Sequence, residues 1–204
     1  MSATNASKKP FLRLATAAVA MVAALGMAAC SGGASTSSSS SSSAQVGDRT
    51  PEQIREAGEI VIGIFSDKAP FGYIDTDGKP AGYDVVYGDR IAADLGVTAK
   101  YVPVDAAART EVLASNKVDI TLANFTVTPE RAEKVDFANP YFKVSLGVVS
   151  PTSAEITDVS QLAGKTLIVT KGTTAEAYFE ANHPEVKLQK YDQYSDAYQA
   201  LEDG

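Results

Sequence analysis

The chain of 204 residues contains one Cys, one His and no Trp. One Cys cannot form a disulfide within the chain, and one Cys with one His is too few for a Cys/His zinc site. A single imidazole also argues against most enzymes that pair a nucleophile with a His. The formal net charge of −7 argues against a nucleic-acid partner, because phosphates require a basic face. We therefore expect no metal, no cofactor and no nucleic acid.

Residues 1–29 have the pattern of a secretory signal peptide. A basic stretch over residues 1–13 precedes an apolar run from Leu14 to Ala29, and the run ends at Cys30. The run is shorter and richer in Ala than a membrane-spanning helix. Met27-Ala28-Ala29-Cys30 resembles the bacterial lipoprotein cleavage box, with Met where Leu is usual. This resemblance implies that Cys30 is lipidated and becomes the new N-terminus. The alternative is an ordinary signal peptide with an incidental Cys.

A Ser/Gly tract follows, from Ser31 to Ser43, and such a tract behaves as a flexible tether. We assign residues 30–50 to a lipid-anchored tether, which places the body at the outer face of the cytoplasmic membrane. Removal of residues 1–29 takes away three cations and changes the formal net charge from −7 to −10. We expect the acidic body to be a soluble monomer.

The body alternates short strands with helices, which predicts an α/β fold with largely parallel sheets. Asp84 is expected to cap the second helix, and His183 to interact with a helix C-terminus. Helices are predicted over 51–57, 85–95, 107–114, 173–181 and 195–202, with further helical turns at 128–133 and near 158. Strands are predicted over 59–64, around 73, and over 100–104, 119–122, 142–150, 166–169 and 186–191.

The segment Ser150-Pro151-Thr152-Ser153 separates two such series. We predict lobe 1 over 51–149 and lobe 2 over 150–204, with a ligand cleft between them. In lobe 1 a helix leads into the strand VDITL, whereas in lobe 2 the helix over 195–202 leads to Gly204. The second lobe is therefore expected to be one strand short, and we predict that the chain is a fragment.

The richest stretch for chemistry is ANFTVTPERAEKVDFANPY, residues 123–141. Thr128 and Pro129 begin a helix, and Arg131 lies beside the end of the strand VDITLA, where α/β sheets bind ligands. Its planar guanidinium can bind a carboxylate through two parallel hydrogen bonds. Thr126 and the backbone of Asn124 can add donors and acceptors. The alternative is that Arg131 is a surface residue paired with an acid.

A second candidate is Lys171-Gly172-Thr173-Thr174, at a strand-to-helix junction of lobe 2. Gly permits a tight turn, a Thr caps the helix, and N–H groups that point outward can bind an anion. A plain helix cap explains the same residues. One carboxylate-binding group on each lobe would let a single ligand bridge the cleft.

Three segments resemble the polar amino-acid substrate-binding proteins of ABC importers, the extracellular solute-binding proteins of family 3. The segments are GYDVVYGDRIAADLG, ANFTVTPERAEKVDFANPY and GKTLIVTKGTT. The first departs from the family pattern, because an acidic residue is usual where Val86 stands. The resemblance covers Glu59 to Gly204 and implies the two-lobe, type II periplasmic-binding-protein-like fold, with the second lobe and the C-terminal return truncated.

The resemblance implies that Arg131 holds the α-carboxylate of an amino acid, aided by Thr126, Thr173 and Thr174 at the helix N-terminus. The carbonyl of Asn124 would accept from the α-ammonium. The family's main partner for that ammonium is an Asp on a strand beyond Gly204.

Within the family the chain is most similar to cysteine- or cystine-binding members. Phe71 and Phe125 would then form apolar walls around a small side chain. Arg109 keeps glutamate and aspartate as alternatives, because in acidic-amino-acid binders a comparable Arg meets the distal carboxylate. Arg109 could instead be a solvated helix residue paired with Glu111 or Asp105.

The leading hypothesis is a non-enzymatic, lipid-anchored receptor that closes around an amino acid and delivers it to a permease. One rival is an enzyme on the same fold, such as a cyclohexadienyl dehydratase or the regulatory lobes of a lytic transglycosylase. An enzyme would need an acid or base aimed into the cleft. A third possibility is the sensor of a signalling protein, which would require a transmembrane helix after the second lobe.

Overall fold

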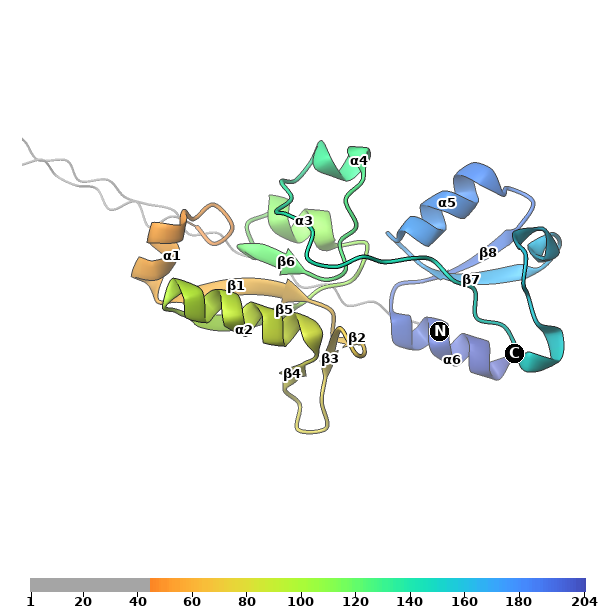
Figure 1. The fold of residues 1–204 in the computed structure, drawn as a ribbon, viewed down its shortest axis with the longest axis horizontal. Helices are drawn as coiled ribbons and strands as arrows, with labels where there is room; N and C mark the ends of the chain where they lie inside the picture. The colour runs from red at the N-terminus through yellow and green to blue at the C-terminus, as the bar shows by residue number, and fades with distance from the viewer. Residues whose placement is uncertain (1–44) are drawn as a thin grey trace, which may run out of the picture. The chain divides into compact units, whose positions relative to one another are not determined.

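The computed structural model describes residues 45–204, and its helices and strands alternate along the chain (Figure 1). The predicted signal peptide, Cys30 and most of the predicted tether lie outside the described residues. Within the described part, no helix has the length and apolarity needed to cross a membrane. The α/β class is confirmed.

The first sheet has three parallel strands in the order β5-β1-β6. Strand β1 spans Glu59–Ile64, β5 Thr98–Pro103 and β6 Ile120–Leu122. Five of the six residues of β1 are buried, because its alternate side chains enter two different cores. Ile60 and Ile62 pack under α1 (Pro51–Ala57) and α2 (Tyr83–Leu95), whereas Val61 packs with Val112 of α3 (Arg109–Ala114).

A small antiparallel sheet of β2 (Asp67–Lys68), β3 (Gly72–Ile74) and β4 (Pro80–Ala81) precedes α2. The prediction that Asp84 caps α2 is wrong. The helix begins at Tyr83 after Gly82, and Asp84 lies inside the first turn with a fully buried carboxylate. Val86 is exposed, as expected for the outer face of this helix.

A separate sheet of two parallel strands is formed later in the chain by β7 (Thr166–Thr170) and β8 (Lys187–Tyr191). It carries the helices α5 (Thr174–Asn182) and α6 (Tyr194–Asp203). The short 3₁₀ helices η1 (Thr152–Ala154) and η2 (Val159–Leu162) precede it. A small core of Leu162, Phe179 and Val186 holds these elements together. His183 lies at the end of α5, whereas its ring nitrogens contact Glu185 and Tyr178, so the predicted interaction of its charge with the helix end stays a prediction.

We call the elements up to α4 (Pro129–Ala132) the first lobe, and those from β7 onward the second lobe. The lobe boundary near residue 150 stays a prediction.

The predicted strand over 142–150 is wrong. This segment forms no helix or strand, and no backbone hydrogen bond joins it to another described segment (Figure 1). Its alternating apolar residues Val144, Leu146 and Val148 are exposed. The alternation is that of a strand, but a strand forms only beside a partner, and residues 45–204 place none there.

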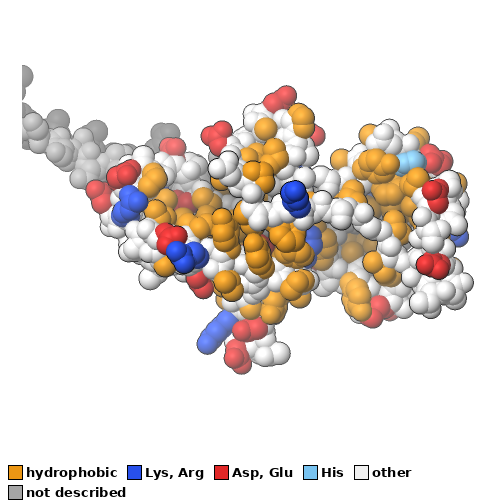
Figure 2. Space-filling model, in the orientation of Figure 1, with side chains coloured by type: hydrophobic (Ala, Val, Ile, Leu, Met, Phe, Trp, Pro, Cys, Tyr) orange, Lys and Arg blue, Asp and Glu red, His pale blue; other side chains and the backbone are white. Residues whose placement is uncertain are grey.

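Hydrophobic side chains gather on the face that carries α2 (Figure 2). The rings of Tyr83 and Tyr87 on α2 stack with that of Tyr141, and Phe142 lies beside Tyr83. This aromatic group fastens the start of the extended segment to the first lobe.

Candidate functional site

A cleft of about 900 Å³ is lined by residues of both lobes. Strand β7 supplies all of its residues, 166–170, and the helix α6 supplies Tyr194 and Tyr198. Seven of the eight predicted binding residues line this cleft, and they are Phe71, Arg109, Asn124, Thr126, Arg131, Thr173 and Thr174. The sequence patterns therefore selected residues that lie together at one cleft, and their role in binding stays a prediction.

Arg131 is placed by the short helix α4, which begins as predicted with Thr128 as its cap and Pro129 in its first position. The guanidinium donates from Nη1 to the carbonyl of Thr126 at 2.8 Å and from Nη2 to the carbonyl of Gly172 at 2.9 Å. No ion pair joins it to an acid within residues 45–204. Burial lowers the pKa of Arg131 from its ordinary value. The arginine is thus a half-buried cation at the cleft wall.

Arg109 is buried, with only 3% of its surface exposed. It donates to the carbonyls of Ala106, Ala123, Asn124 and Gly172 at 2.8–3.0 Å. The alternative of a solvated residue paired with Glu111 or Asp105 is therefore wrong. Burial, and then the nearby charge of Arg131, lower the pKa of Arg109 to about 10, so it remains a cation at neutral pH.

Phe125 does not line the cleft with the other predicted residues. Its ring centroid lies 4.5 Å from the guanidinium carbon of Arg109 and 5.0 Å from that of Arg131. Phe137 packs edge-on against the same ring. An aromatic face attracts cations, so Phe125 supports both arginines from behind.

Asn124 adopts a left-handed backbone conformation, with φ of +45°. Its backbone carbonyl accepts from Arg109, while its buried side-chain oxygen Oδ1 has no partner among the described residues. Asn tolerates this conformation better than most residues. Thr126 uses its carbonyl for Arg131. The site thus holds two oxygen acceptors on Asn124 close to the arginines.

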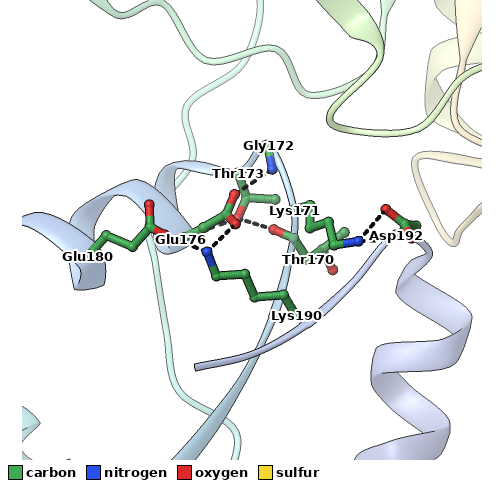
Figure 3. A network of polar contacts seen from close by, with 8 residues as sticks. All are labelled: Thr170, Lys171, Gly172, Thr173, Glu176, Glu180, Lys190 and Asp192. Carbon is green, nitrogen blue, oxygen red and sulfur yellow. Dashed lines mark hydrogen bonds and ion pairs between the residues drawn. The ribbon is translucent and has the colours of Figure 1, made fainter. Parts of the chain in front are cut away.

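The N-terminus of α5 faces the cleft through Thr173 and Thr174. Thr173 caps the helix, since its hydroxyl accepts from the N–H of Glu176 and donates to the carbonyl of Thr170 (Figure 3). The carboxylate of Glu176 accepts a hydrogen bond from the N–H of Gly172 at 2.7 Å and forms an ion pair with Lys190 at 3.0 Å. The N–H groups of this turn were expected to bind an anion. The N–H of Gly172 already donates to Glu176, whereas the N–H groups of Thr173 and Thr174 have no partner in the described chain.

The charge of the cleft is one-sided. Its described lining contains five cationic residues and no acidic one, the cations being Lys68, Arg109, Arg131, Lys143 and Lys165. No group of three or more His, Cys, Asp or Glu side chains within residues 45–204 is placed to hold a metal ion. An unbalanced positive cleft is suited to an anionic group such as a carboxylate.

Lys68 and Tyr194 are among the lining residues that the sequence patterns did not indicate. The amine of Lys68 donates to the hydroxyl of Tyr194 at 3.0 Å, and it lies 4.2 Å from the Tyr194 ring centroid. Phe65 and Phe71 also present their rings to this amine. Tyr194 is far from Lys68 in sequence, and no local pattern marks either residue as a cleft residue.

Residues 60–200 match the family of bacterial extracellular solute-binding proteins, family 3. The chain belongs to this family. The two-lobe binding-protein fold of the family agrees with the two parallel sheets that flank the cleft.

Two solved structures of family members are similar to this chain. The solute receptor for L-cysteine of Neisseria gonorrhoeae is 54% identical with a TM-score of 0.74, over 76% of this chain and 65% of that one. The cysteine-binding protein from Campylobacter jejuni is 51% identical with a TM-score of 0.73, over 75% and 63%.

The L-cystine-binding protein TcyJ of Escherichia coli (strain K12) is 29% identical over 154 residues, which make up 74% of this chain. The chain spans 58% of that relative's length and less than two thirds of the two solved structures. All three relatives are described as receptors or binding proteins.

Proposed function

We propose that this chain is a substrate-binding protein that takes an amino acid into the cleft and delivers it to the permease of an ABC importer. The proposal includes a lipid on Cys30 that holds the protein at the outer face of the cytoplasmic membrane, and a monomeric body. The lipid and the permease are supported by the cleavage-box resemblance and by the family.

The main support for the proposal is that the guanidinium of Arg131 is only partly hydrogen-bonded. A guanidinium has five N–H groups, and Arg131 donates two of them to carbonyls. Three remain without a partner in the described chain, in a cleft whose described lining has no acid. A carboxylate satisfies such a group in bidentate geometry, which neutral ligands cannot do.

The other polar groups complete an amino-acid site. The hydroxyl of Thr126 and the N–H of Thr174 at the start of α5 would share the α-carboxylate with Arg131. The α-ammonium would donate to an oxygen of Asn124, since its buried Oδ1 lacks a partner among the described residues. A further partner for the ammonium, beyond Gly204, remains part of the proposal.

Cysteine or cystine is the favoured ligand, because the receptors with 51–54% identity are described as binding cysteine. Phe71 would form an apolar wall beside a small side chain. Glutamate or aspartate is the second candidate, and the five cations of the lining favour it. An enzyme on this fold is less well supported, because the described lining of the cleft offers no Asp, Glu or His to act as a general acid or base.

Calorimetry on residues 31–204 with the twenty amino acids and cystine tests the proposal. Nuclear magnetic resonance titration, which also detects weak binding, should accompany it. Binding of L-cysteine that is lost in Arg131→Ala, but kept in the exposed control Arg55→Ala, supports the receptor. Equal binding by both variants contradicts it, as does turnover of prephenate or arogenate without amino-acid binding.

A further inference from the structure

The turn between β7 and α5 lies directly against the first lobe. The carbonyl of Gly172 accepts from Nη2 of Arg109 at 2.8 Å and from Nη2 of Arg131 at 2.9 Å. A Cβ atom on Gly172 would lie 2.4 Å from Cα of Ala107 and 2.6 Å from its nitrogen. The two backbones therefore approach more closely at this point than any residue with a side chain permits.

Arg109 is held rigidly on the side of the first lobe. Its Nε donates to Ala106, and its Nη1 donates to both Ala123 and Asn124. The guanidinium is also in contact with the ring of Phe125. Four of its five N–H groups thus have backbone carbonyl partners, and three of those partners belong to the first lobe. Only the bond to Gly172 reaches the second lobe.

In contrast to Arg109, Arg131 has more N–H groups without a partner in the described chain than N–H groups that are hydrogen-bonded. It is half-buried, keeps three N–H groups without a partner in the described chain, and contributes one hydrogen bond to Gly172. A ligand carboxylate would compete with Gly172 for Arg131, because both offer oxygen acceptors to the same guanidinium. The bond from Arg109 to Gly172 can persist when that exchange takes place.

We propose that Arg109 is a positioning residue that fastens the β7–α5 turn to the first lobe, so that Arg131 and the N-terminus of α5 can reach the same ligand carboxylate. The ligand in this statement rests on the proposed function, whereas the fastening itself does not. The other hydrogen bonds between the two lobes lie at the start of α6, where Gln193 donates to Asp105, Ser195 donates to Asp67 and Tyr194 accepts from Lys68. None of these bonds involves the β7–α5 turn, which is hydrogen-bonded to the first lobe only by Arg109 and Arg131 within the described residues.

The fastening can be measured without ligand. Spin labels at Ala93→Cys on α2 and Ala181→Cys on α5, with Cys30→Ser, report the distance between the lobes. Both alanines are small and exposed. Pulsed electron resonance should give a broader and longer distance distribution for Arg109→Met than for the unsubstituted chain. Arg131→Met should keep the distribution nearly unchanged, and so should Arg55→Met, an exposed matched control.

Gly172→Ala is a second variant for the case in which Arg109→Met does not fold. It leaves Arg109 in place but adds the Cβ that clashes with Ala107, and it should shift the distribution in the same direction. An unchanged distribution in a folded Arg109→Met or Gly172→Ala protein would overturn the proposal. Arg109→Lys keeps the charge but cannot span four carbonyls, so it should not restore the distribution.

A ligand measurement separates this proposal from the proposed function. We expect L-cysteine to bind Arg109→Met about tenfold more weakly than the unsubstituted chain. If no amino acid binds either protein but the distance still shifts, the proposed function fails and the fastening stands. If L-cysteine binds both proteins equally well and the distance is unchanged, Arg109 is not a positioning residue.

Discussion

Arg49 and Asp119 form a buried ion pair that joins the segment before α1 to the start of β6. The Asp119 carboxylate also accepts the N–H of Gly47 at 2.9 Å and that of Val61 at 2.7 Å. Every oxygen of this carboxylate is thus satisfied in the interior, and the pair fixes the edge of the first sheet to β1.

Replacement of Asp119 by Ala should strongly destabilise the protein. It would leave the largely buried side chain of Arg49 and the N–H groups of Gly47 and Val61 without an acceptor, which costs about 3 to 5 kcal/mol. Because the chain has no Trp, urea unfolding is best followed by circular dichroism. Asp94→Ala removes an exposed pair with Arg90 and should cost less than about 1 kcal/mol. Equal losses in both variants would contradict the role of Asp119.

The same pair predicts a pH dependence. Burial alone would raise the pKa of Asp119, but the hydrogen bonds from Arg49, Gly47 and Val61 hold it below its ordinary value. The carboxylate therefore stabilises the fold above its unfolded pKa near 4, and this contribution is lost as the pH falls through the folded value. Asp119→Ala should show a flatter acid limb of unfolding free energy against pH.

Asp84 should make the fold less stable as the pH rises, which is opposite to the effect of Asp119. Burial raises its pKa to about 6, while the charge of Lys68 acts against that rise, and neither carboxylate oxygen has a partner in the described chain. The folded state then binds the proton more tightly than the unfolded one, so stability falls as the pH rises from about 4 to about 6. Asp84→Asn should be more stable than the unsubstituted chain at pH 8, by a difference on the order of 2 kcal/mol.

The comparison at low pH tests this explanation. Below about pH 4 both forms are uncharged at residue 84, and their stabilities should converge. Asp94→Asn, at an exposed position, should follow the unsubstituted chain throughout. A constant offset between Asp84→Asn and the unsubstituted chain from pH 4 to 8 would show that packing, not charge, is responsible.

Tyr101 connects the first sheet to α2. Its hydroxyl lies 2.8 Å from the carbonyl oxygen of Val85 and 2.7 Å from the Asp89 carboxylate, so its single proton is shared between these two acceptors, and burial raises its pKa above the ordinary range. Tyr101→Phe should therefore lower the free energy of unfolding by about 1 kcal/mol. The matched change Tyr198→Phe, at an exposed ring, should have little effect. A stabilised Tyr101→Phe protein would show that these bonds are not formed.

Arg131→Lys should weaken amino-acid binding by at least about tenfold, since an ammonium cannot supply two parallel N–H groups to one carboxylate. The stability of the fold should change little, because Arg131 is half-buried and its partners are carbonyls at the surface of the cleft. Nuclear magnetic resonance titration with L-cysteine measures the first effect and urea unfolding the second. Retention of full affinity would exclude Arg131 as the carboxylate partner.

Much of the fold could be predicted from the sequence because local signals agree with the packing. EIVIGI is β-branched and continuous, and it forms the strand β1 that is buried on both faces. Pro51 and Gly58 lie at the start and just past the end of α1, as helix geometry favours. At the site, Thr128 and Pro129 marked the start of α4 and hence the position of Arg131.

The errors arise where distant partners decide the outcome. The environment of Arg109 depends on carbonyls from three separate segments, although Val112 and Leu113 on the same helix face could have indicated that it points inward. Lys68 and Tyr194 meet only through tertiary structure. The alternation over 142–150 was correctly recognised, but a strand also needs a neighbour.

That extended segment also affects how the chain behaves at high concentration. Val144, Leu146 and Val148 present an exposed apolar stripe next to backbone amides that have no partner within residues 45–204. Such a stripe is a template for pairing between copies and for aggregation. The solubility of the chain is therefore expected to depend on this stretch of nine residues, which also lines the cleft, and a charge placed at Leu146 should raise it.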